Sequence, residues 1–152
     1  MSVTISAERP DTEEAMALIA ELEEALAPGY PSESRHGLNV EQLLKQGVAF
    51  FVTRVDGQPA GCGGVKLFGS EYGELKRMYV RPQFRGMGLA KRMVEHLAAY
   101  TLAQGVNTLR LETGIYQHAA INLYENLGFR RIEPFGDYRP DPLSLFYERQ
   151  LS

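Results

Sequence analysis

The stretch RPQFRGMGLA (Arg81–Ala90) decides how this chain folds. It follows YGELKRMYV, which is typical of a β-strand, and precedes KRMVEHLAAYTLAQG, whose apolar residues recur at helical spacing. Gly86 and Gly88 therefore stand where a strand turns into a helix. Backbone N–H groups at such a helix N-terminus can bind an anion, and glycines let the anion approach closely. Arg85 and Lys91 add positive charge, so the stretch indicates a phosphate site, although two glycines could also serve only a tight turn.

The composition is that of one globular domain, which we expect to span residues 1–152. Hydrophobic residues make up 44% of the chain and charged residues 23%, and the net charge of −3 gives no reason to expect a nucleic-acid partner. The single cysteine, Cys62, excludes an internal disulfide and is compatible with a reducing compartment. The sequence shows neither a secretory signal nor an apolar run of about 18 residues, so we expect a cytoplasmic protein without a membrane partner.

The residues before the glycine stretch predict an antiparallel meander. AFFVTRV, the turn Asp56-Gly57 and QPAGCGGVKLF have the pattern of a hairpin, and residues 73–80 give a third consecutive strand. Gly61, Gly63 and Gly64 lie inside the second of these strands. Glycines at such positions indicate a β-bulge or a close backbone contact.

The remaining elements follow from caps and periodicity. Asp11 and Glu14 form a D-x-x-E capping pattern before a helix that ends at Pro28, and Asn39 is expected to cap a short helix through Leu44. A strand is predicted at 3–7, a long helix at 86–103, a strand at 108–113, a helix at 118–127, and final strands at FRRIEPF and LSLFYERQL. The order predicts an α/β (α+β) domain with a mixed, mostly antiparallel sheet of about six or seven strands, flanked by about four helices.

Two familiar phosphate motifs do not fit the glycine stretch. A Walker loop is absent, and a Rossmann fingerprint would need a third glycine where Lys91 stands and a parallel sheet where hairpins are predicted. By contrast, Gln83-Phe84-Arg85-Gly86-Met87-Gly88 resembles the Q/R-x-x-G-x-G/A motif of the GNAT superfamily of N-acetyltransferases. The segment from Ala120 to Phe129 resembles the second motif of that superfamily, and the resemblance covers about residues 73–132.

The resemblance implies a GNAT-like fold that binds acetyl-coenzyme A as co-substrate, with no metal. In this family the glycine loop binds the coenzyme pyrophosphate through backbone N–H groups. Many relatives have asparagine at the start of the second motif, whereas this chain has Gln117 three residues before Ala120. The chain departs from the family pattern at this side-chain contact to the coenzyme. The coenzyme contacts implied in this chain are Met78, Tyr79, Val80, Gln83, Arg85, Gly86, Met87, Gly88, Leu89, Ala90, Lys91, Gln117 and Tyr124.

Amine acetylation needs a group that removes a proton, because an alkylammonium with a pKa of ~10.4 is almost fully protonated at neutral pH. Glu74 resembles the catalytic glutamate of the protein-acetylating branch and is the first candidate, with Glu112 or water as alternatives. Glu74 could instead be a solvent-facing strand residue paired with Lys76 or Arg110, and Glu112 could equally be a salt-bridge partner. Tyr124 is the acid that the resemblance implies, and its alternative role is packing.

We expect the acceptor to be a primary amine of a small molecule, peptide or protein. The walls of the acceptor site should come from the segments YPSESRHGLN and GDYRPDP. Tyr30, Asp137 and Tyr138 are the candidate contacts to the acceptor, and Asp141 is a further one. A non-catalytic acyl-coenzyme A binding module is the alternative function, and either a monomer or a homodimer is compatible with the sequence. The histidines are scattered and indicate no metal, and Cys62 is expected to be a small core residue.

Overall fold

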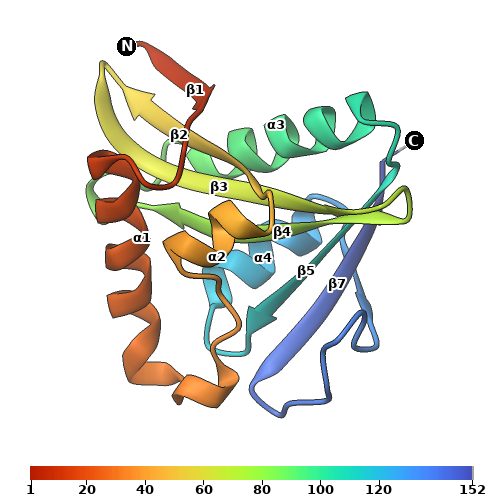
Figure 1. The fold of residues 1–152 in the computed structure, drawn as a ribbon. Coiled ribbons are helices and arrows are strands. Elements are labelled where there is room, and N and C mark those ends of the chain that lie inside the picture. Colours follow the sequence, from red (N-terminus) through yellow and green to blue (C-terminus); the bar gives the residue numbers. More distant parts are fainter. Residues whose placement is uncertain (152) are drawn as a thin grey trace.

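Seven strands form one mixed sheet in the computed structural model, which describes residues 1–151 (Figure 1). The strand order is β1-β2-β3-β4-β5-β7-β6, and β4 with β5 is the parallel pair. The expected mixed, mostly antiparallel sheet with flanking helices is confirmed. The strands are β1 (Val3–Ala7), β2 (Ala49–Val55), β3 (Gln58–Phe68), β4 (Tyr72–Val80), β5 (Thr108–Gly114), β6 (Arg130–Ile132) and β7 (Ser144–Gln150).

Helices cover both faces of the sheet (Figure 1). One apolar cluster joins α3 and α4 to the sheet, and another joins α1 and α2 to the opposite face. Within residues 1–151, no helix is long and apolar enough to cross a bilayer. The helices are α1 (Glu13–Leu26), α2 (Val40–Lys45), α3 (Leu89–Ala103) and α4 (His118–Asn126), with short 3₁₀ turns η1 (Ala27–Gly29), η2 (Ser32–Ser34) and η3 (Pro82–Phe84).

The helix caps agree with the sequence at α2 and differ at α1. Asn39 caps α2 as expected, in a reciprocal capping box with Gln42. The prediction that Asp11 caps α1 is wrong, because the side chain of Thr12 accepts the N–H of Ala15. Asp11 instead pairs with the guanidinium of Arg9 at 2.8 Å.

The strands β4 and β5 diverge soon after they meet. Their parallel pairing is confined to Gly73 with Leu109 and Glu74 with Arg110. β3 covers the other edge of β4 as far as Val80. The edge of Met78–Val80 that faces β5 therefore lacks a neighbouring strand, and its backbone groups are free to pair with a bound molecule.

A β-bulge in β4 confirms the expectation raised by the glycines of β3. The register passes from Cys62 opposite Tyr79 to Gly64 opposite Lys76, so one extra residue of β4 is accommodated. Arg77 takes a left-handed φ of 54° in this bulge. A Cβ on Gly61 would lie 2.5 Å from the carbonyl oxygen of Tyr79, so only glycine permits this backbone approach.

Cys62 is a core residue, as expected. It is buried in the cluster beneath α1 and α2, and its thiol donates to the carbonyl oxygen of Arg77 at 3.3 Å. Burial raises the pKa of Cys62 to about 12. The side chain therefore remains a neutral thiol at physiological pH.

Candidate active site

The N-terminus of α3 has the geometry of an anion-binding site. Helix α3 begins at Leu89, three residues later than expected, because Gly86 and Gly88 have left-handed φ angles of 85° and 76°. No side chain caps this helix, and its first return hydrogen bond runs from the N–H of Arg92 to the carbonyl of Gly88. The N–H groups of the first turn are thus left without intrahelical acceptors. A Cβ on either glycine would meet no atom within 4 Å, so the space above the turn is open.

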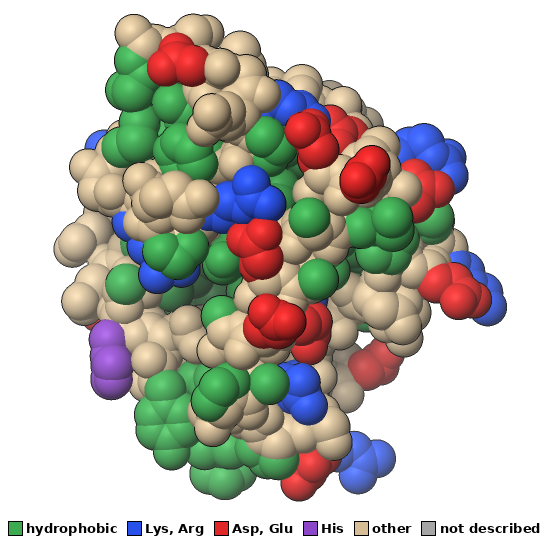
Figure 2. Space-filling view, turned by 90° about the vertical axis from the view of Figure 1, so that its left-hand side faces the viewer, with side chains coloured by type: hydrophobic (Ala, Val, Ile, Leu, Met, Phe, Trp, Pro, Cys, Tyr) green, Lys and Arg blue, Asp and Glu red, His purple; other side chains and the backbone are tan. Residues whose placement is uncertain are grey.

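A cavity of about 440 Å³ leads from this turn along the free edge of β4 to α4. Figure 2, which views the left-hand side of Figure 1, shows Lys and Arg side chains interspersed with Asp and Glu between apolar patches. Most of the expected coenzyme contacts line the cavity: Met78, Tyr79, Val80, Arg85, Gly86, Gly88, Leu89, Ala90, Lys91, Gln117 and Tyr124.

Two expected coenzyme contacts lie outside this cavity lining. Gln83 is exposed on η3. Met87 packs on the small apolar cluster that contains Val55 and Leu89. These two residues therefore do not line the cavity, whereas Gly86 and Gly88 of the turn do.

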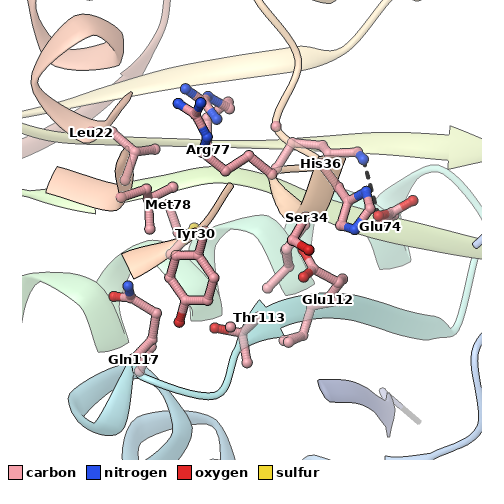
Figure 3. A pocket seen from close by; sticks show the side chains of 18 of the residues that line it. Leu22, Tyr30, Ser34, His36, Glu74, Arg77, Met78, Glu112, Thr113 and Gln117 are labelled. Atoms are coloured by element: carbon pink, nitrogen blue, oxygen red, sulfur yellow. Dashed lines mark ion pairs between the residues drawn. The ribbon is translucent and has the colours of Figure 1, made fainter. Parts of the chain in front are cut away.

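A second cavity of about 140 Å³ opens between β4 and β5 and is closed by the connection from α1 to α2 (Figure 3). We call it the acceptor cavity. It shares Met78, Gln117 and Tyr124 with the first cavity, so the two spaces meet at the start of α4. A group held in one cavity can thereby face a group held in the other.

Glu74 lies on the wall of the acceptor cavity in a fixed hydrogen-bond network. Its carboxylate accepts the hydroxyl of Tyr138 at 2.5 Å and lies 3.0 Å from the ammonium of Lys76, which also donates to Tyr138 at 3.2 Å. Glu74 is only 3% exposed. The alternative of a solvent-facing glutamate is therefore wrong, although the expected pairing with Lys76 is present.

Glu112 reaches the same cavity from β5 with fewer partners. It accepts the hydroxyl of Ser144 at 2.8 Å, and no cation within residues 1–151 lies at ion-pair distance from it. Burial raises the pKa of Glu112, and the hydrogen bond from Ser144 opposes that rise in part. Glu112 is thus the carboxyl group of the cavity that lacks a neutralising partner.

Tyr124 stands where the two cavities meet. It is buried and packs edge-to-face on Phe129, with ring centroids 5.5 Å apart. Burial, followed by the nearby charge of Glu112, raises the pKa of Tyr124. The phenol therefore stays protonated and can donate a hydrogen bond at this junction.

The expected acceptor contacts are divided between two places. Tyr30 and Tyr138 line the acceptor cavity, and the Tyr30 hydroxyl accepts the N–H of Tyr116 at 2.8 Å. Asp137 is exposed and lines a neighbouring cavity on the other side of Tyr138. Asp141 connects the segments YPSESRHGLN and GDYRPDP, because its carboxylate accepts a hydrogen bond from the hydroxyl of Ser34 at 2.8 Å.

Sequence reasoning missed the basic part of the acceptor-cavity wall. Arg35, His36 and Arg77 line it, together with Ser34. Arg35 and His36 belong to YPSESRHGLN, a segment that the sequence predicts in the wall of the acceptor site. The sequence thus predicts the segment and not the role of these two residues. Arg77 carried no signal, because its place in the cavity lining depends on the bulge in β4. Within the described residues, no group of three or more His, Cys, Asp or Glu side chains could hold a metal.

Comparison with known proteins agrees with this geometry. The Acetyltransferase (GNAT) family model matches residues 16–129. The chain is 42% identical to the IAA acetyltransferase of Azospirillum brasilense over 99% of both chains. It is 37% identical, with a TM-score of 0.84, to a crystallised Klebsiella pneumoniae protein provisionally described as an acyl-CoA N-acyltransferase, with 99% of this chain and 98% of that one covered.

A more distant structure shares the fold. The PaiA N-acetyltransferase of Thermoplasma acidophilum, crystallised in complex with coenzyme A, has a TM-score of 0.79 at 19% identity, and 99% of each chain is covered. Taken with the family match, these findings identify the class: the chain belongs to the GNAT acetyltransferase family. It is an enzyme of the N-acetyltransferase type.

The glycine turn gives a test of coenzyme binding. Gly86→Val places a branched side chain in the open space above the turn, and we expect coenzyme A to bind at least about tenfold more weakly by calorimetry, since hydrogen bonds to charged groups are lost. Gly69→Val is the matched control: Gly69 also has a left-handed φ (58°) and open surroundings, but it lies in the β3–β4 turn. Equal affinity of the two variants would contradict the assignment of the turn.

Glu112 gives a pH-dependent test. A carboxyl group whose pKa is raised on folding binds its proton more tightly in the folded state, so its contribution to the free energy of unfolding falls as the pH rises through the raised pKa. We therefore expect Glu112→Gln to gain stability relative to the wild type as the pH rises above the ordinary glutamate pKa of ~4.3. Denaturant unfolding across pH measures this difference, with Glu24→Gln, an exposed position on α1, as the control for net charge. A difference that shrinks with rising pH would contradict the burial of Glu112.

Proposed function

We propose that the protein transfers the acetyl group of acetyl-coenzyme A to a primary amine by direct attack within a ternary complex. The observation that carries this proposal is the junction of two cavities at Tyr124, one leading to the anion-binding turn and the other containing two carboxyl groups. A thioester in the first cavity and an amine in the second would meet at that junction. Family membership supports the acetyl transfer, while the amine acceptor and the direct attack are part of the proposal.

Backbone groups of α3 and β4 support the proposed binding of the coenzyme. The coenzyme diphosphate would accept the free N–H groups at the start of α3, where the helix dipole also favours negative charge. The pantetheine arm carries amides, which can pair with the free edge of Met78–Val80 as an added strand would. These two contacts would place the thioester beside α4, because the cavity that contains them ends there.

The chemical step is nucleophilic acyl substitution. The amine lone pair attacks the thioester carbonyl carbon, a C–N bond forms, the C–S bond breaks, and the coenzyme leaves as a thiolate. The amine proton passes to a carboxylate of the acceptor cavity. A thiol has a pKa of ~8.5 and the pKa of Tyr124 is raised above its usual value, so Tyr124 would stabilise the thiolate by donating a hydrogen bond without losing its proton.

The contacts favour Glu112 over Glu74 as the proton acceptor. The charge of Glu74 is balanced by Lys76, and a hydroxyl from Tyr138 occupies the same carboxylate. Glu112 has no such cation among the described residues, and burial raises its pKa, which makes its carboxylate the stronger base. In this arrangement Glu74 would hold Lys76 and Tyr138 in place at the cavity wall.

The two carboxyl groups can be separated by the pH dependence of turnover. We expect Glu112→Gln to lower kcat/KM by about 10²–10⁴ and to remove the acidic limb of the pH profile, because the group that must be ionised is gone. Glu74→Gln is the matched variant and should retain that limb. Coenzyme thiol release across a panel of amines is the assay. Loss of the limb in Glu74→Gln with its retention in Glu112→Gln would reverse the assignment.

A further inference from the structure

Every buried side-chain polar atom without a hydrogen-bond partner in residues 1–151 belongs to a residue that lines the acceptor cavity. These atoms are Arg35 Nε, His36 Nε2 and Arg77 Nε, and all three residues line the cavity. Buried polar groups in folded proteins almost always have partners, so an exception marks a place where a ligand, an ion or water can bind. All three are nitrogens, and the two guanidinium nitrogens are obligatory donors, so the missing partner is an acceptor of hydrogen bonds.

The guanidinium groups on this wall also carry an unbalanced positive charge. Glu23 on α1 pairs with Arg77 at 2.6 Å and with Arg35 at a longer 3.4 Å. One carboxylate thus faces two guanidinium groups, and the side chain of Arg77 is only 2% exposed. Lys76 does not change this balance, because its charge is matched by Glu74. An anionic group would be stabilised here, and a carboxylate suits the donor geometry of arginine.

His36 adds a further donor or acceptor to the same wall. Its Nε2 lies 3.8 Å from Asp141, too far for a hydrogen bond, and Asp141 already accepts from Ser34 and from the N–H of Leu143. The ring is held edge-to-face against Tyr138, with centroids 5.3 Å apart. Its free nitrogen is therefore positioned by packing and lacks a partner of its own.

The opposite charge is unbalanced elsewhere in the same cavity. Among the described residues, Glu112 has no cation at ion-pair distance, and it receives one hydroxyl hydrogen bond, from Ser144. Figure 3 shows His36 and Glu112 at the cavity, with the guanidinium of Arg77 on the side of α1, where it pairs with Glu23. The cavity thus offers one uncompensated positive charge and one uncompensated negative charge to whatever fills it, which is complementary to a zwitterion.

We propose, on the basis of the proposed function, that the acceptor is a free amino acid. Its carboxylate binds at Arg35, Arg77 and His36, and its amine lies at Glu112, from where it attacks the thioester. A cavity of about 140 Å³ is of a size for a compact molecule of this kind. A lysine side chain within a protein brings no carboxylate of its own to the guanidinium groups.

The wild-type enzyme tests this directly with pairs of acceptors. The common L-amino acids, β-alanine and 4-aminobutanoate are each compared with their own carboxamides, which keep the amine and lose the negative charge. Coenzyme thiol release gives kcat/KM for every compound. We expect the best acids to exceed their carboxamides at least about tenfold, because a charge-assisted hydrogen bond is lost in the carboxamide.

A variant pair locates the effect. Arg35→Gln should lower the acid-to-carboxamide ratio of kcat/KM at least about tenfold, mainly through the KM of the acid. Arg54→Gln is the matched control, because Arg54 also pairs with a glutamate of α1, at 2.7 Å from Glu14, and lies outside both cavities. Thermal melting of both variants shows whether the fold is retained, and the wild-type comparison needs no variant at all.

The outcomes separate the two proposals. Acids preferred over carboxamides, with the preference lost in Arg35→Gln, would support the amino-acid acceptor. Carboxamides turned over as fast as acids, or an unchanged preference in Arg35→Gln, would overturn it while acetyl transfer to amines stands. No thiol release with any compound in either series would overturn the proposed transfer and the amino-acid acceptor together.

Discussion

The early divergence of β4 and β5 is the constraint on which the rest of the site depends. The two strands pair only at Gly73–Glu74 and Leu109–Arg110, so the sheet opens at its centre instead of at an edge. On the edge that faces β5, the backbone groups of β4 beyond that point lack a strand partner, and both cavities lie in or beside the opening. Continuous pairing of these strands would fill the acceptor cavity and remove the free edge.

The bulge in β4 and the glycine turn after it adapt the chain to this opening. The bulge is possible because Gly61 lets β3 approach the carbonyl of Tyr79, and it holds Arg77 in a left-handed conformation that is unfavourable for a residue with a side chain. The ion pair with Glu23 holds the guanidinium of Arg77 toward α1. One local irregularity therefore serves both the backbone edge and the basic wall of the acceptor cavity.

Local signals made most of the fold predictable from the sequence. The Asp56-Gly57 turn, the cap at Asn39 and the glycine pattern of β3 each specify structure through neighbouring residues, and each prediction is confirmed. At α1 the neighbouring residues Asp11 and Thr12 can both cap a helix, and the ion pair with Arg9 removes Asp11 from that role. The choice between them depended on a third side chain, which the capping pattern does not include.

Only the part of the site that lies in sequence motifs could be predicted from the sequence. The glycine turn and Tyr124 lie in sequence patterns, whereas the wall formed by Arg35, His36 and Arg77 depends on a bulge and on how a loop packs. Asp137 was expected beside Tyr138, but neighbouring loop residues face different cavities, and the Tyr138 hydroxyl binds Glu74. Charge balance between segments distant in the chain cannot be obtained from composition.

The most direct test of the site is an NMR titration of the ¹⁵N-labelled protein with coenzyme A. The largest amide shifts are expected in the first turn of α3, at Leu89–Lys91, and along the free edge of β4, at Met78–Val80, because these backbone groups would form the new hydrogen bonds. Shifts concentrated elsewhere, for example on α2, or no shifts at saturating coenzyme A, would contradict the assignment of the opened sheet as the acyl-coenzyme A site.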